Sequence, residues 1–351
     1  MGIAMPELLS SIDQIDSRWL ASVFAPAGID VPAISSFRVA PLGAGNTGTT
    51  VKVSLEYEVS GAAAPASVVC KFHPDDQAKI EAIKSAGVFL TETNVQKLLA
   101  EHCEAAIPEC YFVAVADDGG QFNMVSEDLS EKCELGDQIN GCSIVEARAA
   151  ILELARLHRQ FWNEPRLNDL EWIRPRMPFP ENGLELLDDR LCQLLTEEQH
   201  DVVKQAAPRI YDWLALEPDN QTLIHVDCRV DNLLFDQNNS TSPQAYLIDF
   251  ALVSVGDAVA DVAYFLTSSL SPEDRLACEA DLLDMHTREI ARKDPAYTIE
   301  KAMASYRENI VSSLYLTMVA AMGVPDAPHK RLLLRRLFER NCAALQHWMD
   351  L

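Results

Sequence analysis

The chain has 351 residues, of which 48% are hydrophobic and 23% are charged, an ordinary balance for a globular protein. Acidic residues outnumber basic ones by 53 to 29, which gives a formal net charge of −24. Because so acidic a surface repels a phosphate backbone, we expect no nucleic-acid partner. The longest apolar stretch, Leu314–Val324, is too short to span a bilayer, so we expect no membrane partner either.

Cysteine usage indicates the compartment. The nine cysteines are odd in number and include no C-x-x-C pair, which argues against a disulfide framework and against a zinc site. Residues Met1–Ser11 carry neither a basic region nor a long apolar run, so we expect no secretory signal. A reducing cytoplasm is the predicted location.

The first strong pattern after a predicted helix at Pro6–Phe24 is a glycine-rich loop. Strand-like Phe37–Leu42 leads into Gly43–Gly48, which matches G-x-G-x-x-G, and Val51–Tyr57 then alternates apolar with polar residues as a strand does. A dinucleotide fold would place a helix after the loop, whereas strand, loop and strand are how a kinase covers its nucleotide phosphates. An ordinary glycine-rich hairpin is the alternative. The candidate nucleotide-binding glycines are Gly43, Gly45 and Gly48.

A lysine inside an apolar strand is the next candidate. Lys71 lies in the predicted strand Ser67–Phe72, where an unpaired ammonium group would be costly. Nucleotide phosphates on one side and a carboxylate on the other would relieve that cost. Glu92, on the predicted helix Gly87–His102, is the best carboxylate candidate, and Glu81 is the second. In the alternative interpretation, Lys71 only extends its ammonium group to solvent from a strand end.

The pattern changes from strand to helix soon after a turn at Asp117–Gly120. We place the boundary of two lobes there, with residues 1–126 forming a nucleotide-binding N-lobe and 127–351 forming a C-lobe. Backbone groups exposed at such a hinge can hydrogen-bond an adenine edge. Glu127 and Leu129 are therefore candidate nucleotide-binding residues.

Most of the remaining chain is predicted to be helical, apart from a proline-rich linker at Arg174–Asn182. His158 lies on the apolar face of the first of these helices. At such a position a histidine is more commonly a buried, hydrogen-bonded core residue than a catalytic base. The predicted helices are Ile144–Trp162 with a Ser143/Glu146 capping box, Glu197–Leu216, Pro272–Arg292, Thr298–Met322 and Lys330–Met349.

The stretch with the most chemistry runs from Leu223 to Phe250. His225, Asp227 and Asn232 form H-x-D-x-x-x-x-N, and Asp249 ends a short apolar run. In kinase-fold phosphotransferases the first Asp of this pattern accepts the proton of the attacking hydroxyl, while the Asn and the second Asp bind magnesium. Short strands after the Asn and before the second Asp would hold both metal-binding groups near the loop. Together these features indicate a phosphoryl-transfer site.

Two further residues near this loop each have two possible roles. Arg229 lies two residues after Asp227, where many protein kinases place a lysine that touches the transferring phosphoryl group; the alternative is that it pairs with Asp231 and shapes the loop. Asp261 begins a later helix, where it would either hold the catalytic loop through backbone N–H groups or cap its own helix.

Taken together, these stretches resemble the aminoglycoside phosphotransferase and choline kinase superfamily, closest in pattern to its ecdysteroid kinase-like branch. The resemblance implies an α+β, bilobal protein-kinase-like fold with a small, mainly β N-lobe and a larger, mainly α C-lobe. It also implies ATP and Mg²⁺ as cofactors, with Asp227 as the catalytic base and Asn232 and Asp249 as metal ligands. Lys71 resembles the phosphate-binding lysine of the family, and Glu92 resembles that lysine's partner.

The sequence departs from the family pattern at Val226, where glycine is common, and at Ala251, which replaces a glycine after the aromatic residue. Neither departure removes a group that performs chemistry. The predicted function is ATP-dependent phosphorylation of a hydroxyl on a small molecule, and a nucleotide-binding pseudokinase or regulatory module is the alternative. A protein kinase is disfavoured because Gly256, Asp257 and Asp261 follow Asp249 too closely for a long activation segment. A Cys228–His225 nucleophile pair is disfavoured because the two residues neighbour each other on one loop.

Overall fold

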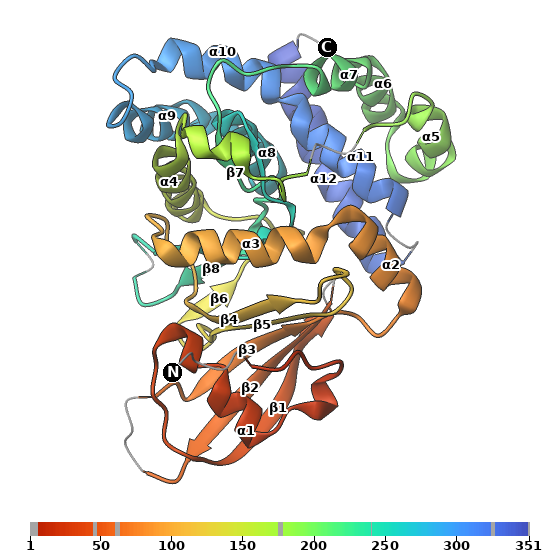
Figure 1. The fold of residues 1–351 in the computed structure, drawn as a ribbon. Coiled ribbons are helices and arrows are strands. Elements are labelled where there is room, and N and C mark those ends of the chain that lie inside the picture. The colour runs from red at the N-terminus through yellow and green to blue at the C-terminus, as the bar shows by residue number, and fades with distance from the viewer. Residues whose placement is uncertain are drawn as a thin grey trace.

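The computed structural model describes residues 6–44, 48–59, 64–174, 178–239, 241–323 and 327–349. The N-terminal part is an antiparallel five-stranded sheet with the strand order β1-β2-β3-β5-β4 (Figure 1). Alternate residues of the second strand, Val51, Val53 and Leu55, are buried on one face, as its sequence pattern predicts. The strands are β1 (Ile34–Ala44), β2 (Thr49–Tyr57), β3 (Ser67–Phe72), β4 (Cys110–Val115) and β5 (Phe122–Glu127).

Helices cover both faces of this sheet. Helix α1 (Ser17–Ser22) packs its tryptophan, Trp19, against Phe72 and Phe112 of the sheet. It is shorter than the predicted Pro6–Phe24 helix because Asp16 caps a new helix after a 3₁₀ turn at Ile12–Gln14. On the other face, α2 (Gln77–Ala86) leads into α3 (Val88–Glu101), which lies between the sheet and the C-terminal helices (Figure 1).

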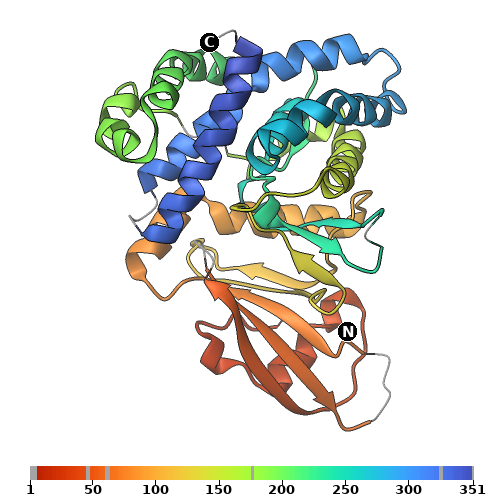
Figure 2. The ribbon, with the colours of Figure 1, turned by 180° about the vertical axis from the view of Figure 1, so that it is seen from behind.

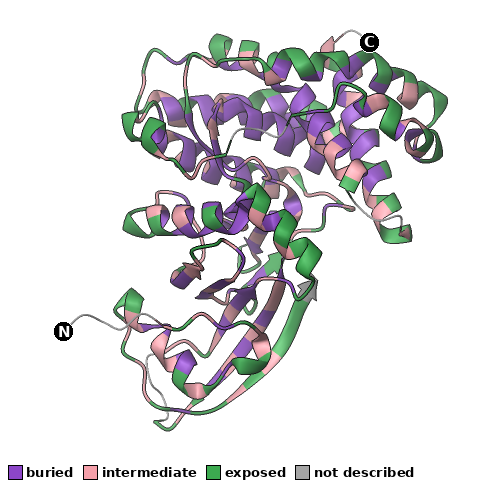
Figure 3. Cartoon of the chain, turned by 45° about the vertical axis from the view of Figure 1, so that its right-hand side comes forward, coloured by how far each residue is buried: buried purple, intermediate pink, exposed green. Residues whose placement is uncertain are grey.

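The C-terminal part is a helical assembly (Figure 2). Its buried residues, purple in Figure 3, include one continuous apolar core. All twelve residues of its central helix α8 are buried, as expected for a helix that is apolar on every side. The helices are α4 (Ile144–Phe161), α5 (Gly183–Leu194), α6 (Glu197–Ala206), α7 (Pro208–Leu214), α8 (Ala258–Ser269), α9 (Pro272–Ala291), α10 (Ile299–Asn309), α11 (Val311–Gly323) and α12 (Pro328–Met349).

Two predicted helices are each divided in the structure. The predicted Glu197–Leu216 helix becomes α6 and α7, because Pro208 has no N–H to donate and instead starts the second helix. The predicted Thr298–Met322 helix becomes α10 and α11, which separate at Ile310. The capping box predicted at Ser143 and Glu146 is confirmed.

Two small sheets lie between the large sheet and the helical core. Strand β10 (Ser254–Gly256) pairs with β7 (Thr222–Ile224), and β8 (Leu233–Asp236) pairs with both β6 (Cys133–Leu135) and β9 (Ala245–Leu247). The predicted strands after Asn232 and before Asp249 are thus β8 and β9. These pairings fix both ends of the segment that carries the candidate catalytic residues.

The mixed α+β fold, with a sheet at the N-terminal end and helices at the C-terminal end, is the predicted one. Strand β5 ends at Glu127, but the exact boundary between 126 and 127 remains a prediction. In the described part of the chain, every helix falls short of the length and apolarity that crossing a membrane requires. The nine cysteines are all free.

Candidate active site

The loop between β7 and β8 brings Asp227 and Asn232 together. The Asn232 amide nitrogen donates to the Asp227 carbonyl oxygen at 2.8 Å and to the Asp227 carboxylate at 2.9 Å. With its nitrogen turned toward Asp227, the amide presents its oxygen as the atom able to bind a cation. Asp227 and Asn232 therefore form one unit, with the carboxylate on one side and the amide oxygen on the other.

Asp261 of α8 anchors this loop through hydrogen bonds to its backbone. Its carboxylate accepts the backbone N–H of His225 at 2.6 Å and that of Val226 at 2.9 Å. The N-cap of α8 is instead Asp257, whose side chain accepts from Val259 at 2.9 Å. Of the two roles open for Asp261 from the sequence, the structure supports anchoring of the loop.

The backbone at this loop is strained. Val226 has φ of +69° and Asp249 has φ of +62°, both in the left-handed region that β-branched and other substituted residues disfavour. A glycine, which is common in the family at the first position, would adopt this conformation at little cost. The valine is accommodated because two hydrogen bonds to Asp261 and pairing in β7 fix the backbone around it.

Lys71 of β3 meets two carboxylates. Its ammonium group lies 2.6 Å from Glu92 of α3 and 3.1 Å from Asp249. Burial alone would lower the pKa of Lys71, but the charges of Glu92 and Asp249 outweigh that effect and raise it, so the lysine is charged. Burial would likewise raise the pKa of Asp249, but Lys71 and the neighbouring His225 and Arg229 keep it below its usual range. The partner of Lys71 is thus Glu92, whereas Glu81 is exposed on α2 and accepts a bond from Gln77.

The glycine-rich loop is only partly described. Gly43 lies at the end of β1, and Gly45 falls outside the described residues. Gly48 is needed for close approach, since a Cβ there would lie 2.2 Å from the carbonyl oxygen of Phe72, one residue beyond Lys71. Gly48, at the start of β2, therefore lies directly beside the strand that carries the lysine.

At the predicted hinge, Asp128 contacts two strands of the large sheet. Asp128 accepts a hydrogen bond from Ser67 at 2.6 Å and pairs with Lys52 at 2.7 Å. Burial would raise the pKa of Asp128, but bonds from Lys52 and Ser67 lower it to about 2. On either side, Glu127 ends β5, and the Leu129 carbonyl oxygen accepts the backbone N–H groups of Lys132 and Cys133.

Two side chains other than Asn232 contact Asp227. Arg229 lies 3.3 Å from its carboxylate and also pairs with Asp231, as in the structural interpretation of this arginine. Tyr264 of α8 donates its hydroxyl to Asp227 at 3.2 Å. Burial and the charge of Asp227 raise the pKa of Tyr264 well above its usual value, so the phenol remains a donor. Sequence reasoning does not single out Tyr264 as a site residue, because its contact with Asp227 depends on how α8 packs against the loop.

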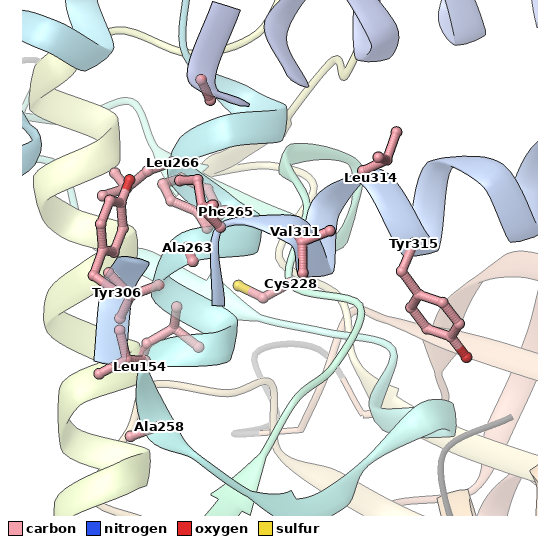
Figure 4. Close-up of a cluster of buried hydrophobic side chains, with 14 of the residues drawn as sticks. Leu154, Cys228, Ala258, Ala263, Phe265, Leu266, Tyr306, Val311, Leu314 and Tyr315 are labelled. Atoms are coloured by element: carbon pink, nitrogen blue, oxygen red, sulfur yellow. The ribbon is translucent and has the colours of Figure 1, made fainter. Parts of the chain in front are cut away.

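Two other candidates are structural. Cys228 is fully buried in the apolar core of the C-lobe, where burial raises the pKa of its thiol well above the usual value (Figure 4). His158 is also buried, bonding Asp261 at 3.1 Å and His286 at 2.9 Å. Neither side chain has the access that a nucleophile or base requires.

Several aromatic side chains of the C-terminal part belong to the core and do not line the candidate active site. Trp162, Tyr306 and Tyr315 are buried, and Trp172 is half-buried. One cavity of about 560 Å³ does expose part of Trp162, beside Trp213 and Tyr297, but Asp227 and Asn232 are not among its lining residues. It is therefore separate from the candidate active site.

The phosphotransferase enzyme family matches residues 54–295, more than half of the chain, including Lys71, Asp227 and Asp249. The chain belongs to this family. A search of curated protein sequences found no match.

Solved structures of phosphotransferases share the fold. An ethanolamine kinase from Plasmodium vivax is 13% identical over 88% of this chain and 83% of its own, with a TM-score of 0.53. Aminoglycoside 2'-phosphotransferase-IIIa, in its GDP complex, is 15% identical over 93% of this chain and 99% of its own, also with a TM-score of 0.53. An amicoumacin kinase in complex with AMP-PNP and Ca²⁺ is 15% identical over 87% of each chain, with a TM-score of 0.51. The predicted superfamily is confirmed, while the ecdysteroid kinase-like branch remains a prediction.

Proposed function

We propose that this phosphotransferase transfers the terminal phosphoryl group of ATP to a hydroxyl of a small molecule in a magnesium-dependent reaction. The observation behind this proposal joins three stretches of sequence. Lys71 pairs with Asp249, the Ile248 N–H just before Asp249 donates to the Asn232 carbonyl oxygen at 3.1 Å, and Asn232 donates to Asp227. Retention of Asp227 favours catalysis over nucleotide binding alone, because only phosphoryl transfer needs a group that accepts the hydroxyl proton.

Asp227 is proposed as that base. The hydroxyl oxygen forms a bond to the γ-phosphorus as its proton passes to the Asp227 carboxylate, and the bond to the bridging oxygen of ADP breaks. Asn232 and Tyr264 hold the carboxylate in place through hydrogen bonds. With these donors fixed before substrate binds, the base needs little reorganisation during transfer.

Asn232 and Asp249 are proposed to bind Mg²⁺. Both supply oxygen atoms, the donors that this cation prefers, and the side chain of Asp249 is 34% exposed and so accessible to solvent. When bound, Mg²⁺ neutralises charge on the β- and γ-phosphate oxygens. The charged Lys71, held by Glu92, is proposed to bind the nucleotide phosphates.

The remaining assignments concern the nucleotide and the loop arginine. We propose that Gly43, Gly45 and Gly48 cover the phosphates and that backbone groups of Glu127 and Leu129 contact the base. Arg229 is proposed to stabilise charge on the transferring phosphoryl group, which requires its guanidinium to exchange a carboxylate contact for phosphate. The nucleotide complexes of the related structures, GDP in one and AMP-PNP with Ca²⁺ in another, support nucleotide and divalent-metal use here.

The acceptor is proposed to be a small molecule such as a hydroxylated amine, sugar, sterol or antibiotic, in keeping with ethanolamine kinase and the aminoglycoside phosphotransferase among the related folds. A cytoplasmic location, without nucleic-acid or membrane partners, is part of the proposal. A nucleotide-binding pseudokinase is the second candidate, favoured by one observation: Val226 holds a strained conformation directly before the base.

The test combines nucleotide binding with turnover. ATP should raise the melting temperature of the wild type much more with Mg²⁺ than without it, and Asp249→Ala should abolish the difference. Asp118→Ala, at an exposed carboxylate in the β4–β5 turn, is the matched control. Equal ATP shifts with and without Mg²⁺ in the wild type would refute the metal assignment.

Turnover is measured as ADP release over a panel of hydroxylated small molecules. With an accepted substrate, Asp227→Asn should lower turnover by about 10²–10⁴-fold, with little change in ATP affinity. A pseudokinase would bind ATP but release no ADP above the Asp227→Asn background with any acceptor.

A further inference from the structure

A cluster outside the candidate active site carries three metal-binding side chains of different types. Asp188 and Cys192 are four residues apart on α5, so they project from one face of that helix. His200 projects from α6, which runs beside α5 in both views of the fold (Figures 1 and 2). One ligand atom from each residue lies within 4.8 Å of the other two.

The imidazole of His200 has a ring nitrogen at this cluster that lacks a hydrogen bond. Its Nε2 atom is buried and has no hydrogen-bond partner, although the Asp188 Oδ1 atom lies only 3.2 Å away. The two atoms are within ion-pair distance without the alignment of a hydrogen bond. A buried ring nitrogen left without a hydrogen bond is costly, and a cation placed between nitrogen and oxygen would satisfy both.

We propose that Asp188, Cys192 and His200 form a site for Zn²⁺ that links α5 to α6. Thiolate, imidazole and carboxylate are the protein ligands of zinc, and three of them leave a fourth, tetrahedral position for water. Zinc–ligand bonds of about 2.0–2.3 Å place tetrahedral ligand atoms about 3.3–3.8 Å apart. Because the Asp188 side chain is half exposed and Cys192 is exposed, small changes of rotamer are enough to bring their atoms to that spacing.

The ligand types set this site apart from the proposed magnesium site. Mg²⁺ prefers oxygen donors and keeps several waters, whereas sulfur and nitrogen donors select zinc and similar transition metals. The cluster cannot be recognised in the sequence, because its proposed zinc ligands include no C-x-x-C pair and come from two helices. Their proximity arises only when the turn at Leu195–Thr196 sets α6 beside α5.

The neighbouring Lys204 supplies an internal test. Its ammonium group lies 3.6 Å from Asp188 Oδ1 and its side chain is half exposed. A bound cation would displace it, so Lys204→Met should leave zinc affinity equal or higher. If Asp188, His200 and Lys204 only form a surface ion-pair network, neither the wild type nor Lys204→Met should bind zinc.

The experiment uses the full chain, freed of metal with a chelator and then desalted. Zn²⁺ is titrated in competition with a chromophoric chelator, and Co²⁺ is added separately as a spectroscopic probe. We expect one tight Zn²⁺ per chain, and Co²⁺ should give visible d–d bands with a sulfur-to-metal charge-transfer band. Cys192→Ser should remove the charge-transfer band.

Ligand variants set the size of the effect. Cys192→Ser and His200→Gln should each weaken Zn²⁺ affinity by at least about 10–100-fold, the loss caused even by removing an outer-shell partner. His102→Gln, at an exposed histidine after α3, is the control and should bind as the wild type does. Melting temperatures without metal show that each variant is folded.

Two results would overturn the proposal: no Zn²⁺ bound by the wild type, or equal affinity in the wild type, Cys192→Ser and His200→Gln. Excess Mg²⁺ should not compete for the site, and competition by millimolar Mg²⁺ would also count against it. None of these readouts requires phosphotransferase activity, so they are independent of the proposed function.

Discussion

The hydroxyl of Tyr264 donates to the carboxylate of Asp227 across 3.2 Å, which connects the central helix of the C-lobe to the proposed base. Hydrogen bonds to charged groups contribute about 1.5–3 kcal/mol. We expect Tyr264→Phe to reduce turnover by about 10-fold or more, because the carboxylate loses a donor that orients it, while ATP affinity stays near that of the wild type.

Tyr306→Phe is the matched control for this variant. Tyr306 is buried and donates to a carboxylate in the same way, to Glu279 at 3.1 Å, but contacts none of the proposed catalytic residues. It should lower the melting temperature and leave turnover per folded molecule unchanged. Equal losses of turnover in the two variants would show that Tyr264 acts through stability alone.

Val226 tests whether backbone strain is present at the catalytic loop. Its φ of +69° costs a substituted residue roughly 1–2 kcal/mol, whereas glycine loses about 0.5–1 kcal/mol through greater freedom in the unfolded chain. Because Val226 is half-buried, its side chain also contributes burial. We therefore expect Val226→Gly to lower the free energy of unfolding by about 1–2 kcal/mol less than the same change at an unstrained half-buried valine.

The control is Val255→Gly, at a half-buried valine in the extended strand β10. There the substitution relieves no strain, and it should cost about 1–2 kcal/mol in urea unfolding. A similar loss at both positions would contradict strain at Val226. Turnover of Val226→Gly should equal or exceed that of the wild type if the valine displaces the base.

The local features of the site were predictable because each depends on a short stretch of sequence. Short apolar runs predicted the strands that carry Lys71 and precede Asp249, and the spacing from Asp227 to Asn232 predicted the catalytic loop. The role of Asp261 stayed open because carboxylates near a helix start have two common uses. Only the packing of α8 against β7 decides between them.

The features of the site that could not be predicted from the sequence depend on contacts between distant segments. The left-handed backbone of Val226 follows from the two hydrogen bonds of Asp261, 35 residues away from it. Helix α5 was not predicted, although it carries two residues of the proposed zinc site. The division at Pro208, in contrast, does have a sequence signal, because proline favours the first position of a helix, but the apolar period on either side predicts one continuous helix.

His286 should make stability depend on pH. His158 donates to the Asp261 carboxylate, so its other ring nitrogen accepts from His286, whose remaining nitrogen is buried without a partner. Burial and the neighbouring His158 hold the pKa of His286 well below its usual value. Below about pH 6.5, His286 therefore binds a proton in the unfolded state but stays neutral in the folded state.

Stability from a neutral His286 is fully present above pH 6.5 and is lost as pH falls, at up to about 1.4 kcal/mol per pH unit. His286→Gln keeps an N–H donor for His158 and does not titrate. Urea unfolding at pH 7.5, 6.5 and 5.5 should show a smaller acid loss in His286→Gln than in the wild type. Parallel curves would mean that another group causes the acid loss.

Arg229 distinguishes a transition-state contact from a structural ion pair. In the structure its guanidinium pairs with Asp231 and lies 3.3 Å from Asp227. If nucleotide binding redirects it to the γ-phosphate, Arg229→Met should lower turnover by about 10²-fold or more, with ATP affinity and melting temperature close to wild type. If it only shapes the loop, melting temperature and turnover should fall together.

Asp231→Asn separates these outcomes further. An asparagine can still accept the Gln138 N–H that Asp231 Oδ1 accepts at 2.8 Å, but it no longer holds the guanidinium by charge. Under the catalytic role, freeing Arg229 from Asp231 should preserve turnover, since phosphate replaces that partner in the complex. Under the structural role, Asp231→Asn should reproduce the loss seen in Arg229→Met, because either change breaks the same pair.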